Sequence, residues 1–141
     1  MSAVQLATTD ADIARCFDVM QQLRPHLTQS GFLAQAKRQQ QNENWHLAYV
    51  EDGGTVAAVA GFRFLECLFS GRTLYVDDLV TSEDQRSKGL GEMLLTWLEN
   101  HARASGCQTF SLDSGTQRTG AHKFYFRMGL PITSFHFAKK L

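Results

Sequence analysis

The stretch QRSKGLGE, residues 85–92, constrains the fold most strongly, because it separates two segments with different periodicities. Residues 74–80 before it are mainly apolar, as in a buried strand. Residues 90–102 after it carry apolar side chains at helical spacing, which predicts an amphipathic helix that ends at Gly106. A strand that leads through a glycine-containing loop into a helix is typical of an α/β domain.

The loop has the features of an anion site. The first N–H groups of a helix have no partner within it, and the helix dipole adds about half a positive charge there. Glycines let an anion approach the main chain, and Arg86 and Lys88 add positive charge. The loop matches neither the P-loop pattern GxxxxGK[ST] nor the dinucleotide pattern GxGxxG. We therefore expect residues 87–92 to bind a diphosphate of another kind.

The remaining pattern predicts one mixed α/β domain over residues 1–141. Helical spacing of apolar residues predicts helices, and alternating or apolar runs between turn signals predict strands. The predicted helices cover residues 10–24, 28–43, 89–105 and 119–128, and the predicted strands cover 4–7, 45–50, 56–65, 73–80, 109–112 and 132–137.

The charge balance and the cysteines argue against several kinds of partner. Lys plus Arg equals Asp plus Glu at 14 each, and a net charge of zero argues against nucleic acid. The three cysteines form no CxxC pair and the histidines lack metal-site spacing, so we expect no metal, and reduced thiols in the cytoplasm. No signal peptide is visible and no apolar run approaches the ~18 residues of a membrane span, so we expect no membrane partner.

Two motifs together resemble one enzyme family. The pattern Arg-x-x-Gly-x-Gly at Arg86, Gly89 and Gly91 resembles the pyrophosphate loop of the GCN5-related N-acetyltransferases (GNAT). The segment AHKFYFRMGL, residues 121–130, is similar to that family's later motif Ala-x-x-Phe-Tyr-x-x-x-Gly-Phe, with Leu130 in the last position. The resemblance spans residues 45–137, and LYVDDLV and LDSG also resemble segments of small bacterial amine and amino-acid N-acetyltransferases.

The resemblance implies a fold, a co-substrate and a reaction. The implied fold is a mixed, mostly antiparallel sheet of six to seven strands flanked by about four helices. The implied reaction is direct transfer of the acetyl group of acetyl-CoA to a primary amine of a small molecule. The implied cofactor contacts are main-chain groups of the strand end for pantetheine and of the loop for pyrophosphate, with cationic side chains beside them: Leu79, Val80, Thr81, Arg86, Ser87, Lys88, Gly89, Leu90, Gly91, Glu92 and Arg118.

The resemblance also implies catalytic roles. Tyr125 corresponds to the general acid that protonates the leaving thiolate, and its phenol is chemically suited to that role. The alternative is a core aromatic on the apolar face of its helix.

Three acidic residues are candidates for the amine site. Asp77 and Asp78 are neighbours on a strand, so we expect them to face opposite sides and only one to line a pocket. We expect Asp77 to receive the amine and its proton and Asp78 to have a structural role, with Asp113 as a second acidic candidate at the same sheet edge.

Two other functions stay open at this level: a CoA-binding regulatory module without turnover, and an acetyltransferase for protein tails. A homodimer is the habit of the family, and Phe135 and Phe137 could serve a dimer interface or belong to the core.

Overall fold

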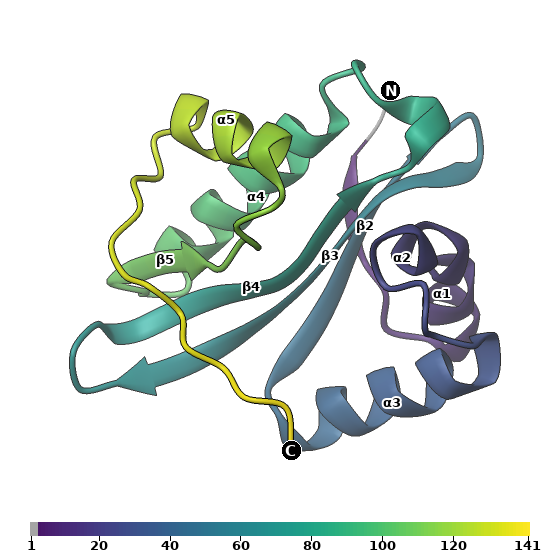
Figure 1. Cartoon of the computed structure of the whole chain (residues 1–141). Coiled ribbons are helices and arrows are strands. Elements are labelled where there is room, and N and C mark those ends of the chain that lie inside the picture. The colour runs from purple at the N-terminus through teal and green to yellow at the C-terminus, as the bar shows by residue number, and fades with distance from the viewer. Residues whose placement is uncertain (1–2) are drawn as a thin grey trace.

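The computed structural model describes residues 3–141, which form a five-stranded sheet with helices on both faces (Figure 1). The strands lie in sequence order, the first four pair antiparallel, and the last pairs parallel with the fourth. The strands are β1 (Val4–Leu6), β2 (Trp45–Asp52), β3 (Thr55–Cys67), β4 (Gly71–Thr81) and β5 (Thr109–Leu112), and the helices are α1 (Asp10–Arg15), α2 (Phe17–Leu23), α3 (Gln29–Asn42), the 3-10 turn η1 (Glu83–Gln85), α4 (Leu90–Ala104) and α5 (Thr119–Arg127).

The sheet separates two apolar clusters, because strand side chains alternate between its faces. Helices α1, α2 and α3 cover one face, and α4 covers the other with α5 beside it (Figure 1). Ile13, Phe17, Met20 and Trp45 belong to the cluster under the first three helices. The second cluster joins α4 to the sheet through Leu74, Val76, Leu90, Leu94 and Leu98.

The predicted helix over residues 10–24 is two helices. Its first turns are capped by the Thr9 hydroxyl, which accepts a hydrogen bond from the Asp12 N–H at 3.1 Å. At Cys16 the N–H donates to the Ile13 carbonyl at 3.0 Å, three residues back. Such a tightened turn interrupts the ladder of four-residue hydrogen bonds. Helix α1 therefore ends at Arg15, and α2 begins at Phe17.

The strand predicted at residues 132–137 does not form, so the sheet has five strands rather than six to seven. Residues 131–141 have no regular secondary structure and are exposed throughout. In Figure 1 this yellow segment crosses in front of the sheet without becoming part of it. Alternation predicts a strand only where a neighbouring strand and a buried face are available, and this segment has neither.

A β-bulge in β4 corrects the expected orientation of the two adjacent carboxylates. Gly61 pairs with Asp78 and Phe62 pairs with Val76, so Asp77 is an extra residue on β4. An extra residue reverses the alternation beyond it. Val76 therefore packs on the α4 side, Val80 packs on the opposite side, and Asp77 and Asp78 both point toward α2 and α3.

Candidate active site

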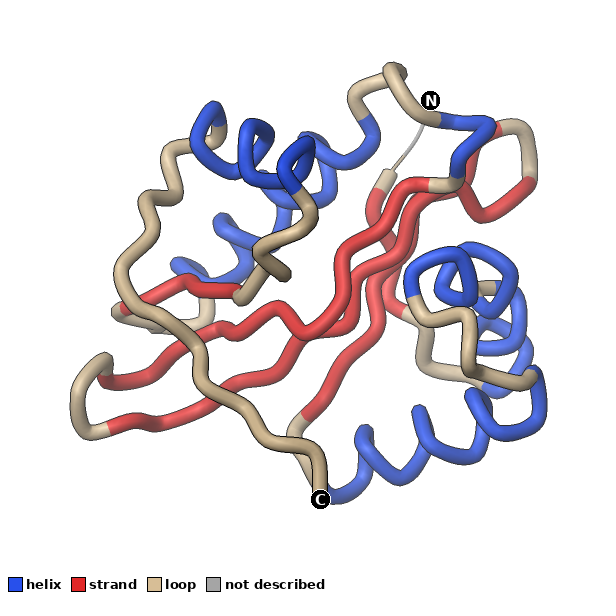
Figure 2. Tube along the Cα trace, in the orientation of Figure 1, coloured by secondary structure: helices blue, strands red, loops and turns tan. Residues whose placement is uncertain are grey.

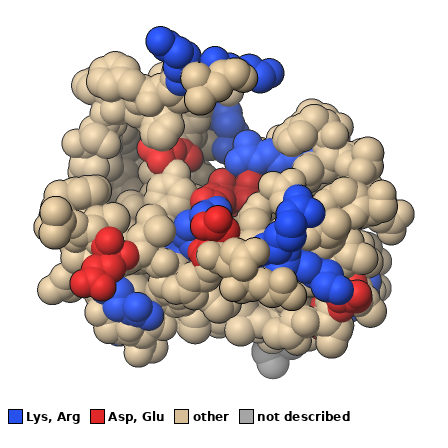
Figure 3. Space-filling model, turned by 90° about the horizontal axis from the view of Figure 1, so that it is seen from below, with Lys and Arg blue, Asp and Glu red and all other residues tan. Residues whose placement is uncertain are grey.

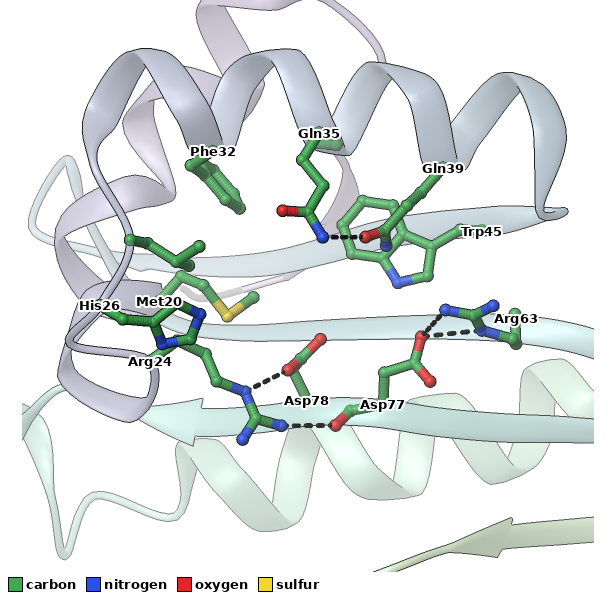
Figure 4. A pocket seen from close by; sticks show the side chains of 12 residues that line it. Met20, Arg24, His26, Phe32, Gln35, Gln39, Trp45, Arg63, Asp77 and Asp78 are labelled. Carbon is green, nitrogen blue, oxygen red and sulfur yellow. Dashed lines mark hydrogen bonds and ion pairs between the residues drawn. The ribbon is translucent and has the colours of Figure 1, made fainter. Parts of the chain in front are cut away.

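The two carboxylates of the bulge form the floor of a cavity of about 330 Å³ between the sheet and α3 (Figure 4). Its walls come from α2, α3, β2, β3 and β4, so residues far apart in the sequence meet there. Arg24, Gln35, Gln39, Trp45 and Arg63 contribute polar groups to the lining. Met20, Leu27, Phe32 and Ala36 contribute apolar surface. The cavity is thus an apolar recess with a few fixed polar groups, as small-molecule sites usually are.

Asp77 is held by a guanidinium from the neighbouring strand. Arg63 Nε and Nη2 donate to the same oxygen, Asp77 Oδ2, at 2.9 and 2.7 Å. The Asp77 side chain is 20% exposed and that of Arg63 is 24% exposed, so the pair is only partly shielded from water. The pair fixes the carboxylate at the cavity floor, as Figure 4 shows.

Asp78 is held by Arg24, which comes from the end of α2. Arg24 Nε donates to Asp78 Oδ1 at 2.8 Å, and its Nη2 donates to the Asp77 carbonyl oxygen at 3.0 Å. Burial raises the pKa of Asp78 above its usual value, and the Arg24 guanidinium opposes this only in part. A carboxylate with a raised pKa is a better proton acceptor than an exposed one.

Gly61 allows two of the lining side chains to pack closely against its backbone. A Cβ built at Gly61 would lie 2.6 Å from Trp45 Cζ2 and 2.8 Å from Asp78 Oδ2. Trp45 is 3% exposed, and its Nε1 has no hydrogen-bond partner in the described chain. A buried donor left without a partner costs about 1–3 kcal/mol, so an orphan of this kind calls for an explanation.

A second cavity, of about 380 Å³, lies at the start of α4 and is lined by the glycine-rich loop. We call it the loop cavity. Gly89 is the N-cap residue of α4 in a left-handed conformation, and no side chain caps this end. The first hydrogen bond of the helix runs from Met93 N–H to the Gly89 carbonyl, which leaves the N–H groups before it outside the helical ladder. Thr81, Arg86, Ser87, Gly89, Leu90, Gly91 and Glu92 all line this cavity.

The two cations of the loop have different surroundings. Lys88 Nζ lies 3.0 Å from Asp52 Oδ2 and 2.6 Å from Gln85 Oε1, so it ties the loop to the end of β2. Arg86 lines the cavity. Arg127 also lines it, from α5, with its guanidinium 5.5 Å from the Phe124 ring. Arg127 was not predicted from the sequence, although its place three residues before the end of the AHKFYFRMGL segment puts it on the same helix as Tyr125.

Strand β4 runs on past the end of β5. The two strands pair only from Thr73 with Thr109 to Val76 with Leu112, and Figure 2 shows β4 continuing beyond β5 toward the loop. Residues 77–81 therefore have a strand neighbour in β3 and none on the β5 side. A free strand edge of this kind can bind an extended ligand through its main chain.

Tyr125 lies on α5, is 8% exposed and lines neither of these two cavities. Burial raises the pKa of Tyr125, and the Arg118 guanidinium beside it opposes this in part. The phenol is therefore protonated at neutral pH, which a proton donor requires. Arg118, expected at a phosphate, lies beside Tyr125 and is absent from the lining of the loop cavity.

Asp113 is not part of the cavity that contains Asp77 and Asp78. Its Oδ2 accepts a short hydrogen bond from the Tyr75 hydroxyl, and its Oδ1 lies 3.8 Å from His136 Nδ1. Burial raises the pKa of Tyr75, and that hydrogen bond raises it further. The structure thus brings two of the three acidic candidates together and separates the third.

Acidic and basic side chains lie next to one another on the side of the molecule seen in Figure 3. Within residues 3–141 no group of three or more His, Cys, Asp or Glu side chains is arranged to hold a metal ion. The same residues include no helix long and apolar enough to cross a bilayer.

Arg24, Arg63 and Trp45 were missed by the sequence argument. For Arg63 a signal existed, because it interrupts an apolar run in a predicted strand. A charged side chain at that place needs a partner.

Comparison with known proteins agrees with this architecture. The family described as "Acetyltransferase (GNAT) family" matches residues 12–130. An uncharacterized N-acetyltransferase, YhdJ of Bacillus subtilis (strain 168), is 34% identical over 133 residues, which are 94% of each chain. Glucosamine 6-phosphate N-acetyltransferase 1 of Oryza sativa subsp. japonica is 35% identical over 127 residues, 84% of this chain and 75% of the relative.

Among solved structures, aminoglycoside N-acetyltransferase AAC(6')-Iy in complex with CoA superposes with a TM-score of 0.84 at 14% identity, covering 100% of this chain and 96% of the other. At this identity the likeness concerns the fold. The family match over residues 12–130 and the YhdJ relative decide the assignment: the chain belongs to the GNAT family of acetyltransferases.

Proposed function

We propose that the protein transfers the acetyl group of acetyl-CoA directly to a primary amine of a small molecule. One observation carries this proposal. The bulge in β4 turns Asp77 and Asp78 into the same cavity at the point where β4 leaves β5. The same strand then leads into the uncapped start of α4. An amine-attracting site and a diphosphate-binding site are thus joined by one free strand edge.

The residues of the loop cavity fit acetyl-CoA. The main-chain N–H groups of residues 87–92 would bind the pyrophosphate, because they are uncapped and no side chain lies within 4 Å of a Cβ built at Gly89. Leu79, Val80 and Thr81 would bind the pantetheine arm through the free edge of β4. Arg86 and Arg127 would add charge at the phosphates. Acetyl-CoA supplies an acetyl group activated as a thioester.

The carboxylates prepare the amine. A primary amine is mostly protonated at neutral pH, and it must lose a proton before it can attack a carbonyl carbon. Asp77 and Asp78 would attract the ammonium, and one of them would take its proton directly or through water. The raised pKa of Asp78 favours it for the proton, although the sequence argument assigned this role to Asp77. Asp77, paired with Arg63, would then position the nitrogen.

Tyr125 would complete the proton balance. When the amine nitrogen bonds to the acetyl carbon and the carbon–sulfur bond breaks, the sulfur leaves as a thiolate that needs a proton. The phenol of Tyr125 is protonated at neutral pH, and burial raises its pKa further, so its hydroxyl can donate that proton. The nitrogen loses its second proton as the amide forms, and this proton, passed through solvent, would return the Tyr125 phenolate to the phenol.

A thiol-release assay with acetyl-CoA and a panel of amines, amino acids, amino sugars and a lysine-containing peptide tests the proposal. We expect release of free CoA with a small amine and formation of its N-acetyl product by mass spectrometry. Tight acetyl-CoA binding without turnover on any amine would indicate a CoA-binding regulatory module instead. Turnover restricted to the peptide would indicate a protein-tail acetyltransferase.

We further propose that the protein works in the cytoplasm as a homodimer. Cys16, Cys67 and Cys107 are all free thiols, as expected in a reducing compartment. Phe135 and Phe137 are 83% and 92% exposed, so this segment presents apolar side chains that a second copy could cover. Light scattering coupled to size exclusion tests the assembly, and a monomer at micromolar concentration would rule out this dimer.

A further inference from the structure

The cavity with Asp77 and Asp78 at its floor, which we call the amine cavity, contains a hydrogen-bond donor that the transfer reaction does not use. Trp45 Nε1 has no partner in the described chain, and the Trp45 side chain is 3% exposed. Figure 4 shows the indole nitrogen on the side of the ring that faces the space above Asp77 and Asp78. A ligand oxygen in this space would satisfy the donor.

Arg63 places positive charge beside this donor. Trp45 and Arg63 are direct partners in the β2–β3 register, so their side chains leave the sheet on the same face. Arg63 Nε and Nη2 contact Asp77, whereas Arg63 Nη1 lies 3.9 Å from Glu43 Oε2, too far for a hydrogen bond. The guanidinium therefore has donor capacity left on its outer side. The indole N–H and this guanidinium form one anion-accepting corner of the cavity.

The charges that line the cavity also favour an acceptor that carries an anionic group. Asp77 and Asp78 are each paired with an arginine, so the two carboxylates of the cavity floor are balanced by Arg63 and Arg24. Glu43 also lies near Arg63, but its side chain is 59% exposed and is screened by water. A bare ammonium ion would leave an unbalanced charge in a partly buried site, which is costly. An amine that also carries an anionic group adds no net charge, because its two ends pair with groups of opposite sign.

We propose that the acceptor is an amine that carries a carboxylate or a phosphate, and that Trp45 Nε1 and Arg63 bind this anionic group while Asp77 and Asp78 bind the amine. The inference rests on the proposed function, because it concerns the acceptor of that reaction. Carboxylate and phosphate are both anions that accept hydrogen bonds from an indole N–H and a guanidinium. Pairs of amines that differ only in the presence of one of these anionic groups distinguish the two.

The experiment compares amines that differ only in the anionic group. Tyrosine is measured against tyramine, and glucosamine 6-phosphate against glucosamine, by kcat/KM for acetyl transfer and by calorimetric Kd in the presence of CoA. We expect at least one anionic member to exceed its neutral counterpart by about 10- to 100-fold, the usual effect of hydrogen bonds to a charged group. The pair that responds identifies carboxylate or phosphate.

Variants assign the preference to the corner. Trp45→Phe removes the N–H and keeps an aromatic ring, and Arg63→Gln removes the charge. Both should reduce the anionic-to-neutral ratio several-fold. Arg63→Lys, which keeps the charge, should retain part of that ratio. Lys37→Gln is the matched control, because Lys37 lies on α3 outside the cavity and pairs with Asp10, and it should leave the ratio unchanged.

The outcomes separate this inference from the proposed function. Equal or better kcat/KM and Kd for both neutral amines would overturn the anionic acceptor and leave the acetyltransferase intact. A calorimetric preference for the anionic members without turnover would support the corner and count against the transferase. An unchanged ratio in a folded Trp45→Phe enzyme, with a normal acetyl-CoA Kd, would overturn the role of the indole.

Discussion

The loop cavity and the amine cavity differ in the residues that line them. The loop cavity at α4 is lined mostly by one short stretch, residues 81–92, which includes two glycines and an uncapped helix start, with Phe124 and Arg127 added from α5. The amine cavity consists of side chains from five elements, and its ion pairs join residues 14 and 54 positions apart. The first can be kept while most of the chain changes, because backbone N–H groups do not depend on side chains. The second changes with single substitutions, which suits a site that must differ with the acceptor.

Removal of the Tyr125 hydroxyl tests whether the two cavities work as one active site. Tyr125→Phe should lower kcat by about 100-fold or more and leave the KM for acetyl-CoA nearly unchanged, because the proton is needed only when the thiolate leaves. The wild-type enzyme should lose activity only above about pH 10, because burial raises the pKa of Tyr125 from its ordinary value, and a general acid works below its pKa.

Tyr49→Phe is the control for this prediction. Tyr49 is 3% exposed, and its hydroxyl contacts Gln5 away from both cavities. An unchanged kcat in Tyr125→Phe would remove this residue from the mechanism.

A charge placed at Gly89 tests the main-chain cavity alone. Gly89→Asp should weaken acetyl-CoA binding by about tenfold or more, because a carboxylate would stand against the diphosphate in an uncapped helix start. Calorimetry measures the Kd. Gly106→Asp is a matched control, since Gly106 has the same φ of 77° and open space around it at the other end of α4. Equal losses of affinity in both variants would show that backbone strain, not the diphosphate, explains the effect.

Neutralising Asp78 tests the side-chain cavity alone. Asp78→Asn should lower kcat/KM for the amine several-fold and raise Tm modestly at pH 7. Burial raises the pKa of Asp78 in the folded state, so its charged form destabilises the fold at a pH above the unfolded value of about 4. The gain in Tm should therefore shrink as the pH falls toward 4, where wild-type Asp78 becomes protonated.

Asp10→Asn, at an exposed carboxylate on α1, is the control for this stability effect. A lower Tm for Asp78→Asn at pH 7 would show that the pair with Arg24 stabilises the fold more than burial of Asp78 destabilises it.

Lys88 should give the smallest effect. Lys88→Gln should change the acetyl-CoA Kd by no more than about twofold, because the Lys88 ammonium is already paired with Asp52 and partly exposed. Arg86→Gln should have a larger effect, since Arg86 lines the cavity. A larger loss in Lys88→Gln than in Arg86→Gln would contradict the view that the main chain and the cavity-lining arginines hold the diphosphate.

The same contrast explains what the sequence could predict. Local periodicity predicted the loop, α4, α5 and the order of strands and helices along the chain from Trp45 to Leu112. The amine cavity depends on a bulge and on Arg24, Trp45 and Arg63, which no local pattern connects. Alternation alone predicted that Asp77 and Asp78 face opposite sides of the sheet, because it assumes an uninterrupted register. The strand predicted at residues 132–137 is wrong for a related reason, since pairing depends on a partner that local sequence does not specify.

The bulge has a consequence for insertions and deletions among relatives of this protein. Because one additional residue decides which way β4 side chains point, loss of a single residue between Val76 and Leu79 would restore regular alternation. Only one carboxylate would then remain between these two residues, and it would still face the amine cavity, because Val76 and Leu79 both point toward α4. Chain length at this place, and not only residue identity, therefore decides whether a relative keeps a paired acidic site. Alignments that place a gap freely in this segment would compare residues from opposite faces of the sheet.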